Sequence, residues 1–272
     1  MTTRGFARVL PVVCALLCAE TSARALDLTS PNDLPPSAWI VDFGGYGVFE
    51  PIYEGSRTYT FGFKPQIDIR QPGDKEWLAF PNDAVSINVY ETSNFRTGPA
   101  FNLSLQSRYH GEDIDVRLGK ADVDLAGGVF AEYYPLGHIR TRVELLRGVT
   151  GNTGFAANLS TDYIWRPYPE WTLTLGPRAQ LANDQYASDY FSTQNAQKTG
   201  VYVPFHAEGG LLSAGAELMG KYDWTAQISS KFFVDYTQLV GDAADSPHVA
   251  ARGSAEQFIA GIGASYKFAI QP

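Results

Sequence analysis

Residues 58–70 read TYTFGFKPQIDIR, and every second side chain of this stretch is apolar. Phe61, Phe63 and Ile67 share one parity, whereas Lys64 and Asp68 share the other. Because successive side chains of a β-strand point to opposite faces, this alternation predicts a strand with one apolar and one polar face.

The same alternation recurs along the chain and predicts about twelve strands. They cover residues 39–49, 58–70, 76–80, 83–91, 95–109, 123–134, 138–148, 154–165, 171–182, 209–222, 224–237 and 255–268. Most are longer than the usual five or six residues of soluble strands and are long enough to cross a bilayer at a tilt. In lipid only a closed sheet pairs all of its backbone groups. We therefore expect an all-β fold, a transmembrane antiparallel up-and-down β-barrel of the bacterial outer membrane.

The strand count depends on residues 76–91. Twelve strands require that residues 76–80 and 83–91 form separate strands, bent at Pro81 and Asn82. The alternative is a ten-strand barrel with an irregular segment at this place. Both counts are even, as bacterial single-chain barrels require.

The first 25 residues have the features of a secretory signal peptide. Arg4 and Arg8 precede the apolar stretch 9–17, and Ala23-Arg24-Ala25 is a small-x-small cleavage pattern. Residues 26–38 then form a periplasmic N-terminal segment with three prolines, which is either a flexible recognition arm or an inert leader. Residues 39–268 form the barrel, and residues 269–272 a short C-terminal tail.

Composition limits the function classes. The 272 residues are 44% hydrophobic and 18% charged, with a formal net charge of -8, so the overall charge does not favour nucleic-acid binding. Both cysteines lie in the signal peptide, which leaves the mature chain without a disulfide or thiolate site. The four histidines lie in connections and match no catalytic pattern. We expect a non-enzymatic protein with no catalytic residue, metal or cofactor.

Loop lengths and tryptophans orient the barrel. The connections at 71–75, 92–94, 135–137, 166–170 and 223 are short, whereas those at 50–57, 110–122, 149–153, 183–208 and 238–254 are longer. Short periplasmic turns and long external loops are typical of outer-membrane barrels. An outward aromatic belt at the periplasmic ends is expected from Trp39, Trp77, Trp165, Trp171 and Trp224.

The polar parity carries charges of both signs, interleaved along the strands. This pattern predicts a paired network that fills a narrow lumen, since an ion-selective channel would concentrate one sign. The expected members are Lys64, Arg108, Glu132, Arg140, Arg142, Glu144, Asp162, Arg178, Lys231 and Asp235.

Several motifs, taken in order, resemble the MipA/OmpV family of outer-membrane proteins. They include residues 44–48 (GGYGV), 51–56 (PIYEGS), 130–133 (FAEY), 142–145 (RVEL), 149–151 (VTG) with Gly154, 175–177 (LGP), 184–186 (DQY) with Tyr190 and Phe191, and 239–247 (LVGDAADSP). Two of these motifs lie in external loops. Their members are Tyr53, Glu54, Gly55, Ser56, Gly241, Asp242, Asp245, Ser246 and Pro247, for which loop structure is favoured over direct binding.

The resemblance implies a scaffold that joins a lytic murein transglycosylase to a murein synthase at the periplasmic face, within outer-membrane lipid. It supplies no catalytic residue. Two other functions stay open: a small channel or permeability factor that affects antibiotic susceptibility, and a surface adhesin that uses the external loops. The oligomeric state cannot be derived from the sequence.

Overall fold

The computed structural model describes residues 24–26, 34–35, 37–104, 124–150, 153–193 and 204–271. They form one antiparallel sheet with a few short helices. Ten strands have ten or more residues each: β2 (Trp39–Pro51), β3 (Tyr59–Arg70), β6 (Phe95–Ser104), β7 (Asp124–Leu136), β8 (Ile139–Gly148), β9 (Phe155–Trp165), β10 (Trp171–Ala182), β11 (Gly210–Asp223), β12 (Ile228–Leu239) and β13 (Glu256–Gln271). The short strands are β1 (Arg24–Leu26), β4 (Val85–Ser86) and β5 (Tyr90–Glu91).

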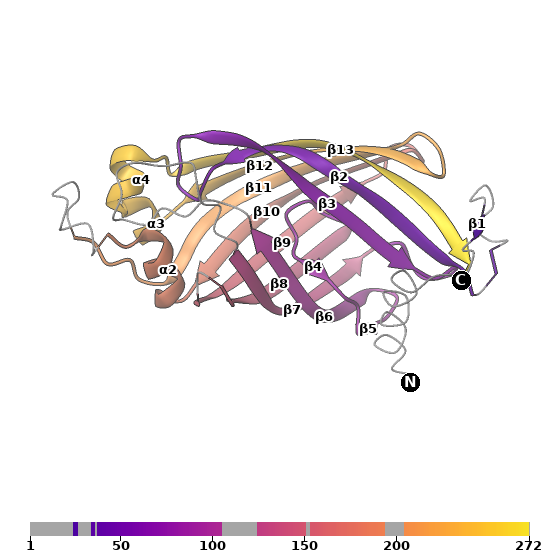
Figure 1. The fold of residues 1–272 in the computed structure, drawn as a ribbon, viewed down its shortest axis with the longest axis horizontal. Helices are drawn as coiled ribbons and strands as arrows, with labels where there is room; N and C mark the ends of the chain where they lie inside the picture. Colours follow the sequence, from indigo (N-terminus) through magenta and orange to yellow (C-terminus); the bar gives the residue numbers. More distant parts are fainter. Residues whose placement is uncertain are drawn as a thin grey trace.

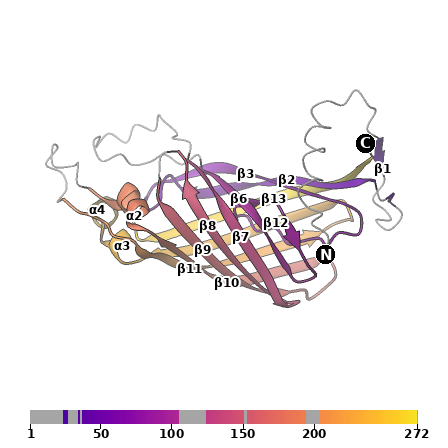
Figure 2. The ribbon, with the colours of Figure 1, turned by 90° about the horizontal axis from the view of Figure 1, so that it is seen from below.

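Neighbouring strands pair in the order β3-β2-β13-β12-β11-β10-β9-β8-β7-β6-β4, while β5 pairs with β6 and β1 with β13. The sheet curls around an interior, as the two views at right angles show (Figure 1, Figure 2). Among the described residues, the order ends at β3 on one side and at β4 on the other. The predicted antiparallel barrel architecture is confirmed.

The alternating sequence places apolar side chains on the outer face of the sheet and buried charged side chains on the inner face. In β8 the side chains of Arg140, Arg142 and Glu144 are buried, whereas Leu145 is exposed. Large apolar side chains are exposed all around the sheet, among them Phe61, Phe63, Ile67, Leu103, Val129, Leu175 and Ile262. Such a continuous apolar surface is expected of a barrel whose wall faces lipid. Within the described residues, no helix is long and apolar enough to span a membrane.

The two ends of the barrel differ. Residues 137–138, 166–170 and 224–227 make short connections at one end, where β13 also finishes. The helices α2 (Asp184–Phe191), α3 (Asp242–Asp245) and α4 (Pro247–Arg252) gather at the opposite end (Figure 1). This arrangement agrees with the predicted orientation, in which short turns face the periplasm. The helices themselves were not predicted, because both segments were expected as loops.

Residues 76–80 correct the sequence analysis, since they form no strand. Twelve strands do run from β2 to β13, but β4 and β5 are only two residues long and both pair with β6. Trp77 and Phe80 are buried, so this segment lies inside the curl and cannot add a strand to the wall. Among the described residues, the strands from β2 to β13 thus match the expected count of twelve, with ten long strands and the two short strands β4 and β5.

The C-terminus is a second difference. β13 continues to Gln271, so residues 269–271 extend the strand that was expected to end at 268. Ala269 pairs with Ile40 of β2 and is fully buried. The signal peptide stays a prediction: residues 1–23 lie outside the described part, and Arg24–Leu26 pair with the end of β13.

Candidate functional site

The lumen contains a network of buried ion pairs centred on Arg140. This side chain is 0% exposed and donates hydrogen bonds to Glu132 (2.9 and 2.8 Å) and Asp162 (2.8 Å). Its Nη2 atom also contacts Asp83. A buried cation is tolerated only when carboxylates surround it. Arg140 lies on β8, between Glu132 on β7 and Asp162 on β9, so the neighbouring strands place both carboxylates beside it.

The network extends to the neighbouring strands. Arg142 pairs with Glu144 at 2.7 Å and with Glu132 at 3.2 Å. Arg178 of β10 bridges Asp162 at 2.7 Å and Glu217 at 2.9 Å. Thus six of the expected members, together with Glu217, form one connected group.

The other expected members lie apart from this group or outside the described part. Lys64 pairs with Glu50 at 3.2 Å, Lys231 donates to the Gln66 amide at 2.7 Å, and Asp235 accepts a hydrogen bond from Thr237 at 2.8 Å. Arg108 lies outside the described residues.

Residues 71–84 run from an exposed periplasmic turn at 71–76 into the interior of the barrel, and we call them the lumen segment. Asn82 donates to Glu217 (2.8 Å) and accepts a hydrogen bond from Lys64 (3.0 Å), so the segment contacts β11 and β3 together. The Ala84 N–H donates to Glu144 at 2.9 Å. The segment therefore completes the network that the sequence located only on the strands.

An apolar layer surrounds Phe80 of the lumen segment. Its ring packs with Tyr46, Val48, Met219 and Phe233, which come from β2, β11 and β12. The Arg140 guanidinium lies 3.9 Å from the centroid of the Phe80 ring. A cation over an aromatic face is attractive, and this contact joins the apolar layer to the ion pairs.

Trp77 is a correction to the expected aromatic belt. Its indole is 8% exposed, packs inside the barrel with Tyr134 and Ile164, and donates to Glu91 at 2.8 Å. The other four tryptophans lie at the periplasmic ends of strands: Trp165 and Trp224 are exposed, and Trp39 and Trp171 are half-buried. The alternating pattern placed Trp77 on the outer face, and this prediction was wrong because the lumen segment is not a strand.

Glu76 fixes the periplasmic end of the lumen segment. It contacts Lys267 at 2.9 Å, Arg70 at 2.7 Å and Lys221 at 3.6 Å. Burial alone would raise the pKa of Glu76, but the hydrogen bond from Lys267 and the three positive charges outweigh it and lower the pKa to about 2. Glu76 therefore stays ionised, and this anchor persists through the physiological pH range.

The first loop motif forms a tight turn at the external end. Gly55 has a φ of +91°, which favours glycine, and its N–H donates to the Gln257 side chain at 3.1 Å. The Ser254 N–H donates to the Gly55 carbonyl at 2.9 Å, and the Ser56 N–H to the Tyr53 carbonyl at 3.0 Å. The loop between β2 and β3 is thus joined to the start of β13.

The second loop motif lies beside the first. Gly241 has a φ of +55°, and the Asp245 N–H donates to its carbonyl at 3.0 Å. Asp242 accepts a hydrogen bond from the Glu208 N–H at 2.7 Å. Pro247 begins α4, where its missing N–H costs nothing.

His248 is where the two motifs meet. Its Nδ1 lies 2.9 Å from Ser246 Oγ, and its ring stacks on Phe191 and lies 6.4 Å from the Tyr53 ring, centroid to centroid. Ser246 and His248 are 0% and 2% exposed, and Ser246 also donates to the Phe191 carbonyl. This Ser–His pair is buried and hydrogen-bonded, so it lacks the accessible hydroxyl that a nucleophile needs.

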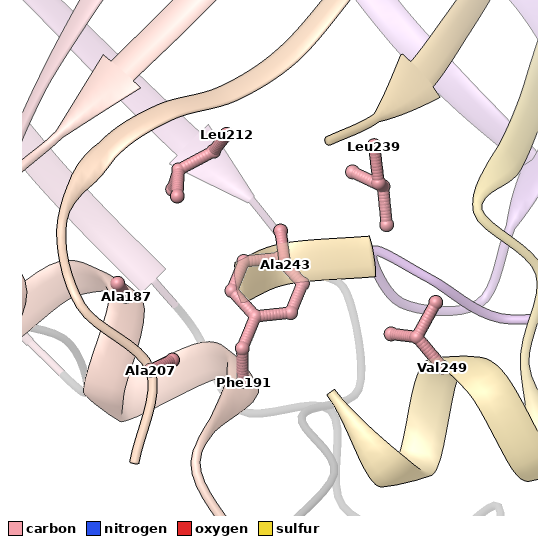
Figure 3. Close-up of a cluster of buried hydrophobic side chains, with 7 residues drawn as sticks. All are labelled: Ala187, Phe191, Ala207, Leu212, Leu239, Ala243 and Val249. Atoms are coloured by element: carbon pink, nitrogen blue, oxygen red, sulfur yellow. The ribbon is translucent and has the colours of Figure 1, made fainter. Parts of the chain in front are cut away.

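We call the three helices, the 52–58 loop and residues 204–209 the external cap. Its apolar core joins α2, α3 and α4 to the ends of β11 and β12 (Figure 3), through Ala187, Phe191, Ala207, Leu212, Leu239, Ala243 and Val249. The side chain of Asn183 begins α2 by accepting from the Tyr186 N–H at 3.1 Å. This apolar core anchors the cap on the ends of β11 and β12.

Three ionisable groups of the cap have shifted pKa values. Burial raises the pKa of Glu54 to about 7 and lowers that of His248 to about 4. Burial, and then the charge of Glu54, raise the pKa of Tyr186. The cap therefore favours neutral forms of both Glu54 and His248.

The sequence analysis missed the lumen segment and its role. Glu76, Phe80, Asn82 and Asp83 all contact the wall, yet none was proposed as a site residue. The usable signal was the loss of period two between residues 71 and 84, combined with Trp77, Phe80 and Pro81.

The comparison with known families identifies one match. The model described as "MltA-interacting protein MipA" matches residues 43–268. No curated protein sequence is significantly similar to the chain.

Solved structures of outer-membrane proteins resemble the chain at low identity and low TM-score. An outer membrane channel from Pseudomonas putida F1 is 13% identical, with a TM-score of 0.44 over 89% of this chain and 99% of that one. The NanC porin is 10% identical, with a TM-score of 0.42 over 83% and 98%. OmpT of Vibrio cholerae is 8% identical, with a TM-score of 0.37 over 86% and 99%.

Proposed function

The chain belongs to the MltA-interacting protein MipA family, and we propose that it is a non-enzymatic scaffold that binds a lytic murein transglycosylase at the periplasmic rim. It is an outer-membrane β-barrel of a Gram-negative bacterium. The family match over residues 43–268 is the observation that carries the proposal. Joining that enzyme to a murein synthase, as the resemblance implies, belongs to the same proposal.

The filled lumen and the external cap support this choice of surface. Arg140, Asp83 and Phe80 occupy the interior, and the cap packs over the β11–β12 side of the external end. A murein enzyme works in the periplasm, so its contacts fall on the periplasmic turns or on residues 26–38.

The turn at residues 166–170 presents an exposed aromatic side chain on that rim. It reads RPYPE, and its Tyr168 side chain is 66% exposed between two prolines. The Trp171 N–H donates to the Tyr168 carbonyl at 3.1 Å, and the Asp223 N–H to the Glu170 carbonyl at 2.9 Å. A rigid exposed tyrosine loses little entropy on binding, which makes it a favourable interface residue.

Binding of a purified lytic murein transglycosylase to the folded barrel tests the proposal, with isothermal titration calorimetry as the readout. We expect Tyr168→Ala to weaken binding about tenfold or more. The matched control is Val149→Ala, which changes an exposed side chain near the external end. Deleting residues 28–36 tests the N-terminal arm separately. If the unaltered barrel does not bind the enzyme, the scaffold proposal is wrong.

A further inference from the structure

We propose that residues 71–84 form a displaceable plug, and that the barrel conducts small hydrophilic solutes once this plug leaves the lumen. This inference does not rest on the scaffold function, because it concerns the interior and not the rim. It rests on the contacts that hold the lumen segment and on the ion pairs that the wall retains without that segment.

Residues 82–84 of the plug are held by polar contacts of Asn82, Asp83 and the Ala84 backbone. Asp83 touches Arg140 and lies 3.6 Å from Arg142. Asn82 bonds to Lys64 and Glu217, and the Ala84 carbonyl accepts from Arg142 at 3.1 Å. Water can replace such hydrogen bonds when the plug leaves, unlike the contacts of an apolar core.

The wall keeps its own ion pairs without the plug. Arg140 retains Glu132 and Asp162, and Arg142 retains Glu132 and Glu144. Removing one partner of a buried pair is strongly destabilising only when it leaves a charge uncompensated. The plug therefore acts as an added ligand on a complete wall, and the central arginines need not collapse when it leaves.

The same redundancy holds for the cations farther from the centre. Lys64 retains Glu50, Arg70 retains Asp68 and Lys221 retains Asp223. Lys267 loses the carboxylate of Glu76, but it lies at the periplasmic mouth, where water reaches it as the plug withdraws. The wall is thus compatible with a lumen filled with water.

Phe80 and Gly73 define how the plug is retained and where it can bend. Phe80 packs against β2, β11 and β12, and Trp77 packs against Tyr134 and Ile164, so these two side chains supply most of the hydrophobic retention. Gly73 lies in the exposed periplasmic turn with a φ of +88°, and a side chain there would meet nothing within 4 Å. This turn leaves room for the plug to move toward the periplasm, and it is the hinge in this proposal.

The charges of the emptied wall indicate the class of solute. The central network of the wall contains four arginines and four carboxylates: Arg96, Arg140, Arg142 and Arg178 with Glu132, Glu144, Asp162 and Glu217. In this central group, four charges of each sign give little ion selectivity, in contrast to pores lined by one sign. We therefore assign the path to small neutral or zwitterionic hydrophilic solutes.

Planar-bilayer conductance of a double variant, Glu76→Gln with Phe80→Ala, tests the proposal. These changes remove the periplasmic anchor and the Phe80 contacts, and they leave Trp77 as the remaining large apolar contact. We expect stable ohmic steps, a reversal potential near zero in a KCl gradient, and at least about a tenfold rise in open probability over the unaltered chain. Leu175→Ala, on the lipid-facing side, is the control and should not open the lumen.

A thiol crosslink ties the current to the plug. Lys64→Cys and Asn82→Cys are added to the double variant and joined by a short bifunctional thiol reagent, since Lys64 Nζ and Asn82 Oδ1 lie 3.0 Å apart. We expect the crosslink to abolish conduction. A folded double variant that stays silent, or a current that persists after crosslinking, overturns the proposal.

A second measurement covers failure of the double variant to fold. Asn82→Cys in the otherwise unaltered chain is treated with a membrane-impermeant maleimide, while a gel shift on heating reports the folded barrel. Labelling of the folded barrel supports displacement of the plug. If labelling begins only when the barrel itself unfolds, the proposal is wrong.

Discussion

Arg142 shows what a single side chain contributes to this barrel. It is 2% exposed, and its partners are Glu144, Glu132 and the carbonyl of Ala84. We expect Arg142→Ala to destabilise the folded barrel by about 3–5 kcal/mol, because it leaves buried carboxylates without their cation.

Urea unfolding in lipid measures this loss. Arg147→Ala is the matched control, because Arg147 is exposed on the same strand and lies over the Phe155 ring at 5.2 Å. Equal midpoints for the two variants would contradict the view that the network stabilises the barrel.

His248 and Glu54 give the external cap opposite pH dependences. The pKa of His248 is about 4 in the folded cap and 6.5 when free, so the unfolded cap binds the proton more readily. His248 therefore destabilises the cap as pH falls from 6.5 toward 4, by up to about 3 kcal/mol. The pKa of Glu54 is about 7 against 4.5 when free. Its ionisation therefore destabilises the cap as pH rises from 4.5 to 7.

Amide hydrogen exchange of α2, corrected for the intrinsic rate, separates the two groups. In Glu54→Gln, only His248 remains, and protection should fall below pH 6.5. In His248→Gln, only Glu54 remains, and protection should fall as pH rises above 4.5. A flat profile in both variants would show that neither group is buried as described.

Alternating parity predicted the wall residues of the site but not the residues that enter from the lumen segment. Glu132, Arg140, Arg142, Glu144, Asp162 and Arg178 could be placed inward because each lies on a regular strand. Asp83 and Phe80 could not, since their positions depend on tertiary contacts with strands far away in the sequence. Trp77 was misplaced for the same reason.

Among the elements, the contact between β6 and residues 85–91 holds the end of the plug in place. A Cβ added to Gly98 would lie 2.0 Å from the Ile87 carbonyl oxygen, so this pairing requires glycine. We expect Gly98→Ala to destabilise the pairing by about 1–3 kcal/mol.

Hydrogen exchange of two amides reports this pairing. The Ile87 N–H donates to the Pro99 carbonyl and the Val89 N–H to the Thr97 carbonyl, each at 3.0 Å. Both should lose protection in Gly98→Ala. Gly127→Ala is the control, because a Cβ there has its nearest neighbour, on Phe101, at 3.8 Å. Unchanged protection in Gly98→Ala would mean that β6 does not hold this segment.

At the scale of elements, the long strands were predictable to within a few residues, since period two persists throughout each one. The helices of the cap were not. α3 and α4 have four and six residues, too short to show a helical period, and they are held by the apolar core around Phe191 and Val249. Their stability is tertiary, so local sequence carries little of it.

The whole molecule combines an apolar lipid-facing wall with an interior filled by its own chain. Three sets of contacts fill this interior: the ion pairs around Arg140, the apolar layer around Phe80, and the anchor at Glu76. The family match is the basis on which we propose that the periplasmic rim binds a murein enzyme. The sequence pattern predicted the barrel and the paired interior charges, but the segment that closes the lumen required the structure.

Single-channel conductance of the unaltered, refolded chain in a planar bilayer tests this account most directly. A gel shift on heating confirms that the inserted protein is folded. Because residues 71–84 fill the lumen, we predict that the folded barrel stays silent in the large majority of recordings. Stable ohmic steps as the dominant state of the unaltered barrel would contradict the closed lumen, and with it the argument that the rim is the working surface.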